Sequence, residues 1–260
     1  MSRLAGLFAN RSKRALLMPY TTGGFPTLAG CRRVMEAFIA GGADIIELGV
    51  PFSDPLADGP VVQASTQAAL DEGVTTDDVL GLAAEFSGRL PVVLLVYYNT
   101  VFAYGIEKFV TAAAGAGIDG LIVPDLPVDE AEVFIKHCRA HEVDPVLLVA
   151  PTTPQARIRM VAAKASGFIY CVSVAGVTGA RTSLSDQLPD FLARVKNETD
   201  VALAVGFGVS EPEHADVVAR YADGVIIGSR LIKMISDAPD IESACRDIER
   251  FLKDVNGVLA

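Results

Sequence analysis

The feature that most constrains the fold is an alternation, repeated eight times, between short apolar runs and longer amphipathic stretches. The short runs have the length and β-branched character of strands, and the stretches between them have helical periodicity. The predicted strands are Leu16–Thr21, Asp44–Leu48, Val92–Tyr97, Gly120–Val123, Pro145–Val149, Phe168–Val172, Val201–Val205 and Gly224–Ile227. The predicted helices between and after them are Thr27–Ala40, Asp77–Arg89, Ile106–Ala114, Asp129–His141, Pro154–Ala165, Leu188–Asn197 and Glu211–Arg220. Strands that alternate with helices pair in parallel through right-handed crossovers, and eight such strands can close into a barrel.

The length of 260 residues fits one such barrel, because single-domain α/β barrels typically have about 250 residues. Extra helices are predicted at Leu4–Lys13, before the first strand, and at Pro60–Leu70, after the second, while Ile241–Val255 would be the closing helix. No linker or low-complexity tract divides the chain. We therefore expect one α/β domain over residues 1–260, a (βα)8 barrel with added N-terminal and loop helices.

Composition excludes several classes of protein. The net charge of −10 argues against binding to nucleic acid or to anionic membranes. We expect neither a secretory signal nor a membrane span, because no apolar run is long enough. The four cysteines are scattered and form no C-x-x-C pair, which is typical of reduced thiols in a cytoplasmic protein.

The most informative loop follows the second predicted strand and reads E-L-G-V-P-F-S-D-P-L-A-D-G-P from Glu47 to Pro60. Glu47 ends an apolar strand, where a carboxylate is costly unless it is paired or its pKa rises. Asp54 and Asp58 lie in the polar loop, and two acids in unlike settings suit acid–base chemistry. The alternative is that Glu47 has a structural partner and that both aspartates only form turns.

Strand alternation places Glu47 on the same face as Ile45. If Ile45 points into the barrel, Glu47 lies at its mouth, with a raised pKa and the ability to transfer protons. Four apolar or aromatic residues would shape a flat pocket there, although each could be an ordinary core residue: Tyr20, Leu95, Tyr170 and Phe207.

Glycines follow the last two predicted strands, where a barrel of this kind commonly binds phosphate. Gly208, Gly228 and Ser229 would let backbone N–H groups at helix starts reach the phosphate oxygens, unless they only form tight turns. The segment Gly176–Ser183 has two glycine hinges and could close as a lid or be a plain surface connection.

Other chemistries are disfavoured. The lysines near the predicted strands all lie in helical stretches, which argues against a Schiff-base aldolase: Lys108, Lys136, Lys164, Lys196 and Lys233. His137 and His141 have helical spacing beside Cys138 but lie at the opposite end of the barrel, so we expect a solvated helix and no metal site. Nucleotide-binding glycine motifs are missing as well. What remains is cofactor-free acid–base chemistry on a phosphorylated substrate.

Taken together, the motifs Glu47–Pro60, Ala175–Gly179, Gly206–Gly208 and Gly228–Ser229 resemble the tryptophan synthase alpha subunits, with similarity over essentially the whole chain. The resemblance implies a TIM barrel that cleaves indole-3-glycerol phosphate, by a retro-aldol reaction, to indole and glyceraldehyde 3-phosphate. It implies no cofactor in this chain. Pyridoxal phosphate would belong to a beta subunit that converts the indole to L-tryptophan within an alpha2beta2 heterotetramer.

The same resemblance implies roles for individual residues. Glu47 would be the acid–base group that protonates indole C3 and deprotonates the adjacent hydroxyl. Asp58 would hold the indole N–H and stabilise its developing charge, with Tyr170 assisting. Substrate would contact Tyr20, Leu95 and Phe207 at the indole, Gly179, Gly208, Gly228 and Ser229 at the phosphate, and Thr178 in a lid bridged to Asp58. Pro51 and Asp54 would lie in the loop that faces the beta subunit.

Three positions depart from the pattern of well-known members. Tyr20 stands where they have Phe, Phe25 where they have Asp, and Val174 where they have Arg. Tyr20 adds a hydroxyl near the pocket, and Val174 bears on lid closure. Two further hypotheses stay open: a stand-alone indole-3-glycerol-phosphate lyase, and a non-catalytic subunit that binds the phosphate ligand.

Overall fold

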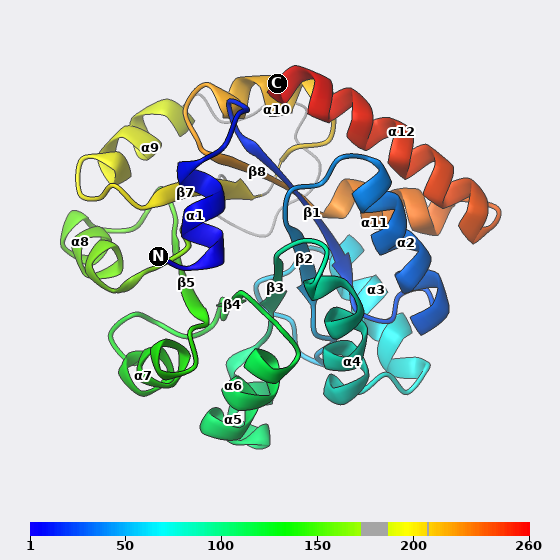
Figure 1. Cartoon of the computed structure of the whole chain (residues 1–260), viewed down its shortest axis with the longest axis horizontal. Helices are drawn as coiled ribbons and strands as arrows, with labels where there is room; N and C mark the ends of the chain where they lie inside the picture. The colour runs from blue at the N-terminus through cyan, green and yellow to red at the C-terminus, as the bar shows by residue number, and fades with distance from the viewer. Residues whose placement is uncertain (173–186, 207) are drawn as a thin grey trace.

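In the computed structural model, which describes residues 1–172, 187–206 and 208–260, eight parallel strands form a closed barrel surrounded by helices (Figure 1). The strands are β1 (Leu16–Thr22), β2 (Ile46–Gly49), β3 (Val92–Leu95), β4 (Gly120–Ile122), β5 (Asp144–Val149), β6 (Phe168–Val172), β7 (Ala202–Gly206) and β8 (Gly224–Ile227). The helices in the described part of the chain are α1 (Arg3–Ala9), α2 (Leu28–Ala40), α3 (Pro60–Asp71), α4 (Thr76–Ser87), α5 (Tyr98–Tyr104), α6 (Ile106–Gly115), α7 (Glu132–Ala140), α8 (Gln155–Lys164), α9 (Leu188–Lys196), α10 (Pro212–Ala219), α11 (Ser229–Asp237) and α12 (Ile241–Leu259). The predicted barrel is confirmed, including the added helices α1 and α3.

Strand alternation separates two apolar cores. Ile45, just before β2, belongs to the core inside the barrel, together with Val93 and Ile226. Ile46 and Leu48 belong to the core between the barrel and its helices. Because Ile45 points inward, the side chain of Glu47 also faces the barrel interior, as predicted.

Helix α1 closes the amino-terminal end of the barrel, where Figure 1 shows it lying across the strands. Leu4 and Phe8 are fully or almost fully buried in the inner core, and the Phe8 ring lies 5.7 Å from that of Phe168. The helix ends at Ala9 rather than at the predicted Lys13, because Asn10 caps it by donating its side-chain N–H to the Gly6 carbonyl.

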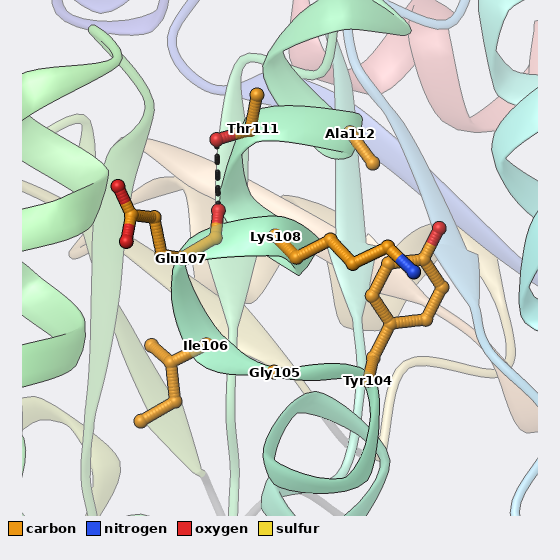
Figure 2. A pocket seen from close by; sticks show the side chains of 7 residues that line it. All are labelled: Tyr104, Gly105, Ile106, Glu107, Lys108, Thr111 and Ala112. Atoms are coloured by element: carbon orange, nitrogen blue, oxygen red, sulfur yellow. Dashed lines mark hydrogen bonds between the residues drawn. The ribbon is translucent and has the colours of Figure 1, made fainter.

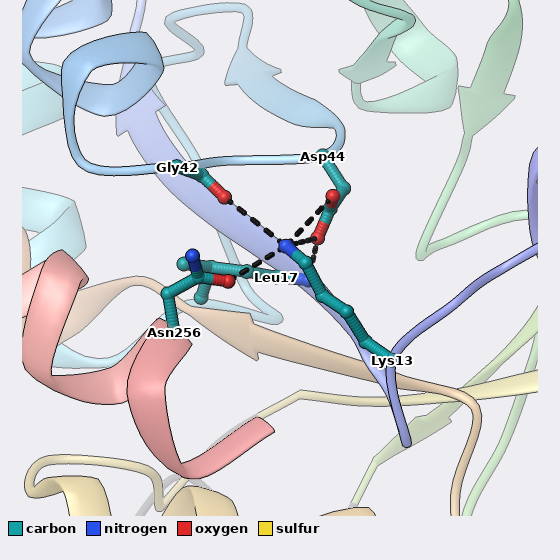
Figure 3. Close-up of polar contacts among 5 residues, drawn as sticks. All are labelled: Lys13, Leu17, Gly42, Asp44 and Asn256. Carbon is teal, nitrogen blue, oxygen red and sulfur yellow. Dashed lines mark hydrogen bonds and ion pairs between the residues drawn. The ribbon is translucent and has the colours of Figure 1, made fainter. Parts of the chain in front are cut away.

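The segment after α1 is fixed by a polar cluster at the same end (Figure 3). Lys13 Nζ lies 2.9 Å from both Asp44 carboxylate oxygens and 2.6 Å from Asn256 Oδ1. Asp44 Oδ2 also accepts the Leu17 N–H at 2.8 Å. Asp44 thus serves as an anchor for neighbouring segments, and β2 begins at Ile46 rather than at Asp44 as predicted.

Two elements differ more from the prediction. Strand β3 ends at Leu95 instead of Tyr97, and α5, which was not predicted, follows because Asp125 Oδ1 accepts the Tyr98 N–H at the first turn. Helix α11 follows β8 without an intervening loop. The two unpredicted helices, α5 and α11, both begin at the carboxyl ends of the strands, where the candidate site lies.

Candidate active site

Glu47, on β2, is the most unusual carboxyl in the barrel. Its side chain is 1% exposed, and its Oε2 atom has no hydrogen-bond partner among the described residues. Burial, and secondarily the charge of Asp58, raise the pKa of Glu47 to about 8. Near neutral pH this carboxyl is therefore mostly protonated and can act as an acid.

Asp58 is also buried, so the predicted contrast between a buried glutamate and an aspartate on a polar loop is wrong. The chain folds Asp58 inward through a turn in which the Asp58 N–H is donated to the Pro55 carbonyl at 3.0 Å. Burial raises the pKa of Asp58 to about 6, against the lowering effect of a hydrogen bond from Tyr97. The real contrast between the two acids is that Asp58 has a donor.

Tyr97 provides that donor, and it was missed in the sequence. Its hydroxyl donates to Asp58 Oδ2 at 2.9 Å and accepts the Ala57 N–H at 3.0 Å, while its ring stacks on Phe52 at 5.1 Å. These contacts hold the acidic loop over the barrel mouth. The only sequence signal for Tyr97 was its position just after the third strand.

Tyr20 on β1 and Tyr170 on β6 are buried beside the two carboxyls, each 5% exposed. Burial is the main reason that the pKa of each tyrosine is raised, and the charges of both Glu47 and Asp58 add to it. A methyl group at Gly49 would collide with the Tyr20 hydroxyl, and one at Gly206 with the Tyr170 hydroxyl. Glycine at the ends of β2 and β7 therefore makes room for both rings.

Leu95 ends β3 half-buried and packs against both cores. Three predicted substrate contacts, Thr178, Gly179 and Phe207, lie outside the described residues, as do Val174 and the predicted lid.

The candidate phosphate residues divide into two groups. Helix α11 begins at Ser229 directly after Gly228, and the first N–H groups of a helix have no intrahelical acceptor and favour an anion. Gly208 has φ of +87°, which only glycine adopts readily. Helix α10 begins at Pro212, one residue later than predicted, so Gly208 lies in the loop before this helix and not at its first turn.

The two residues predicted to face a partner differ in their exposure. Pro51 is buried, whereas Asp54 is exposed and accepts a hydrogen bond from the Ser53 hydroxyl at 2.6 Å. Leu56, two residues further along, is 81% exposed. Asp54 and Leu56, but not Pro51, are therefore accessible to another protein.

Two other features of the described residues were candidates for a competing site. A surface hollow at the start of α6 contains Lys108 Nζ 4.9 Å from the Tyr104 ring centroid, but none of the candidate residues lines it (Figure 2). His141 pairs with the Thr111 hydroxyl, and the described residues contain no group of three His, Cys, Asp or Glu side chains that could hold a metal. Within the same residues, no helix combines the length and apolar character needed to span a membrane.

A closed (βα)8 barrel with two coupled, buried carboxyls at the carboxyl ends of its strands defines the class, an α/β-barrel protein equipped for acid–base chemistry. Residues 8–257 match the family model described as tryptophan synthase alpha chain. The chain is 47% identical over 244 residues to the tryptophan synthase alpha chain of Chloroflexus aurantiacus, with 92% of each chain covered. It is 47% identical over 242 residues to that of Methanosarcina mazei, covering 93% of this chain and 89% of the relative.

Solved structures agree with these sequence matches. A chain of tryptophan synthase from M. tuberculosis, 33% identical, superimposes with a TM-score of 0.90 and covers 100% of this chain and 99% of its own. A chain of the tryptophan synthase complex from Pyrococcus furiosus, also 33% identical, gives a TM-score of 0.86, covering 94% and 98%. The chain belongs to the tryptophan synthase alpha chain family. It is accordingly a lyase of tryptophan biosynthesis in the alpha-subunit role.

Proposed function

We propose that the chain cleaves indole-3-glycerol phosphate to indole and glyceraldehyde 3-phosphate, by a retro-aldol reaction that uses no cofactor of its own. The observation that carries the proposal is the Glu47–Asp58 pair. With pKa values of about 8 and about 6, one carboxyl is mostly protonated and the other mostly ionised near pH 7. A buried acid within the electrostatic influence of a buried anion suits this reaction.

Glu47 both gives up and regains a proton during the proposed reaction. Glu47 donates its proton to indole C3, and the Asp58 carboxylate, held by Tyr97, stabilises the positive charge that develops on the ring nitrogen. Ionised Glu47 then takes the proton of the hydroxyl next to C3. The bond between C3 and that carbon breaks, its electrons restore the indole, the hydroxyl becomes an aldehyde, and Glu47 is again protonated. Tyr170 assists beside Glu47.

Substrate binding uses both sides of the barrel mouth. Tyr20, Leu95 and Phe207 would flank the indole, and Thr178 would bridge a closed lid to Asp58. The phosphate would bind to Gly179, Gly208, Gly228 and Ser229. The N-terminus of α11 supports the last two assignments, since its N–H groups can bind an anion despite the net charge of −10.

The alpha chain would act with a pyridoxal-phosphate-dependent beta subunit in an alpha2beta2 heterotetramer. Exposed Asp54 and Leu56 support a contact at the acidic loop, with Pro51 buried beneath it. A tryptophan synthase complex is among the similar structures. The four buried free thiols support a location in the reducing cytoplasm.

An indole-release assay tests the chemistry. We expect Glu47→Gln to lose at least 10²–10⁴-fold in kcat, because a positioned acid–base group contributes about that much. Asp58→Asn should also be severely impaired, with little change in affinity for inorganic phosphate. Glu107→Gln, which changes a surface acid of α6, is the matched control and should keep wild-type activity. Wild-type turnover by Glu47→Gln would refute the proposed role.

Adding a beta subunit separates the remaining hypotheses. A large activation of indole release by the beta subunit supports the complex, whereas full activity of the isolated chain favours a stand-alone lyase. Lack of turnover in both conditions would leave the non-catalytic binding subunit.

A further inference from the structure

Three hydroxyls form a buried line beside the Glu47–Asp58 pair. The Tyr20 hydroxyl lies 3.3 Å from the Thr22 hydroxyl on the same strand, and Thr22 Oγ1 lies 2.7 Å from Ser65 Oγ on α3. Ser65 Oγ lies 2.8 Å from the Val62 carbonyl oxygen. Thr22 and Ser65 are at most 1% exposed, so bulk water does not compete for these hydrogen bonds.

The direction of donation along this line is fixed by its far end. A carbonyl oxygen can only accept, so Ser65 donates its proton to Val62. Each hydroxyl has a single proton. Thr22 must therefore donate to Ser65, and Tyr20 must donate to Thr22. Because its proton points to Thr22, the Tyr20 hydroxyl can offer only the lone pairs of its oxygen to Glu47 and Asp58.

Tyr20 is placed to act on Glu47. The two residues are direct partners in the β1–β2 pairing, and partners on parallel strands project from the same face of the sheet. Gly49, two residues beyond Glu47, lies against the Tyr20 ring. The charges of both Glu47 and Asp58 raise the pKa of Tyr20, which agrees with this placement.

Among the described residues, the titratable groups that interact with the carboxyl pair come from four parts of the barrel. Asp58, from the loop after β2, raises the pKa of Glu47, and Tyr97, after β3, donates to Asp58. The charges of both carboxyls in turn raise the pKa of Tyr20 on β1 and of Tyr170 on β6. The Tyr97 proton is used in the hydrogen bond to Asp58. The orientation of the Tyr20 proton can therefore change without changing that hydrogen bond.

We propose that Thr22 and Ser65 are positioning residues that hold the Tyr20 proton away from the carboxyl pair, so that the Tyr20 oxygen opposes ionisation of Glu47. The inference deepens the proposed function, on which it rests for its significance, because it adds to burial and to the charge of Asp58 a third influence that keeps the acid protonated. Its test requires no substrate.

Breaking the line should release the Tyr20 proton. In Thr22→Val, Tyr20 loses its acceptor and can donate to ionised Glu47, which favours the carboxylate. In Ser65→Ala, Thr22 loses its own acceptor and turns its proton to the Tyr20 oxygen, which again frees the Tyr20 proton. Tyr20→Phe removes the hydroxyl without supplying a donor. We therefore expect the pKa of Glu47 to fall in all three variants, most in Thr22→Val and Ser65→Ala.

The measurement is a pH titration of the full chain by NMR, with ¹³C-labelled glutamate side-chain carboxyls and Glu47→Gln to assign the signal. The free energy of one hydrogen bond corresponds to a pKa change of roughly one unit. We therefore expect the pKa of Glu47 to fall by roughly 0.5–1.5 in Thr22→Val and Ser65→Ala, and by less in Tyr20→Phe. Thr22→Ser keeps the hydroxyl and should restore the wild-type titration.

A matched control is Thr21→Val, which removes the neighbouring buried hydroxyl on the opposite face of β1 and should leave Glu47 unchanged. An unchanged or higher pKa in Thr22→Val would overturn the proposal, as would a fall in Thr22→Val that Ser65→Ala does not reproduce. A larger fall in Tyr20→Phe than in Thr22→Val would contradict the proton orientation. These results are independent of whether Glu47→Gln loses indole release, so the two proposals fail separately.

Discussion

Glu47 and Asp58 are both buried at the barrel mouth, and burial raises the pKa of each. What separates them is one hydroxyl, since Tyr97 donates to Asp58 and stabilises its carboxylate, whereas Glu47 Oε2 has no partner among the described residues. A carboxyl without a donor is better protonated than ionised in such a place. The assignment of acid and anion follows from this difference.

An unpartnered acid should weaken the fold at high pH. The pKa of Glu47 is about 8 in the folded protein and 4.5 as the ordinary value, so the folded state holds an extra proton between these pH values. The linked stabilisation is full below about pH 4.5 and is lost as the pH rises through 8. Glu47→Gln cannot ionise, and we expect it to gain on the order of a few kcal/mol over the wild type between pH 5 and pH 9.

Urea unfolding of both proteins at pH 5, 7 and 9 measures this gain. Ile46→Val is the control, because it changes the same strand without a titratable group, and its difference from the wild type should not vary with pH. A Glu47→Gln difference that stays constant across this range would show that Glu47 ionises as easily in the folded protein as in the unfolded chain.

Gly49 offers a second test at this scale. A methyl group there would collide with the Tyr20 ring and hydroxyl, so we expect Gly49→Ala to lose roughly 1–3 kcal/mol of unfolding free energy. Gly81→Ala, on an exposed position of α4 with open space around it, should instead gain about 0.5–1 kcal/mol. Thermal unfolding compares the two. Equal effects would mean that Tyr20 does not pack on Gly49.

At the scale of elements, local patterning predicted what local residues determine. The bounds of β6 and β8 match the prediction, because apolar runs flanked by polar residues set both ends. Strand β2 starts late because the Asp44 side chain binds Lys13 and Leu17, which lie 27 or more residues earlier. The burial of Asp58 and its contact with Tyr97, 39 residues away, arise only when the barrel closes.

The Lys13–Asp44 cluster should stabilise the closure of the barrel by α1. Lys13 and Asp44 are each less than a quarter exposed, and Lys13 has three partners, so removing it leaves a partly desolvated carboxylate. We expect Lys13→Met to cost roughly 1–3 kcal/mol, between the values for surface and buried pairs. Arg33→Met, which breaks a half-exposed pair with Glu242, should cost less than about 1 kcal/mol in the same urea experiment. Equal costs would assign Lys13 no special role.

At the scale of the whole molecule, the charge of −10 opposes the approach of the proposed phosphorylated substrate, whose binding would then depend on short-range donors such as the N-terminus of α11. Salt shortens the reach of the repulsion from about 30 Å at 0.01 M to about 8 Å at 0.15 M. We therefore expect kcat/KM for indole-3-glycerol phosphate to rise a few-fold between these ionic strengths, while kcat stays nearly constant. Potassium glutamate is the appropriate salt, because its bulky anion competes poorly for a phosphate site. A fall in kcat/KM would show that local positive potential at the barrel mouth outweighs the net charge and attracts the substrate.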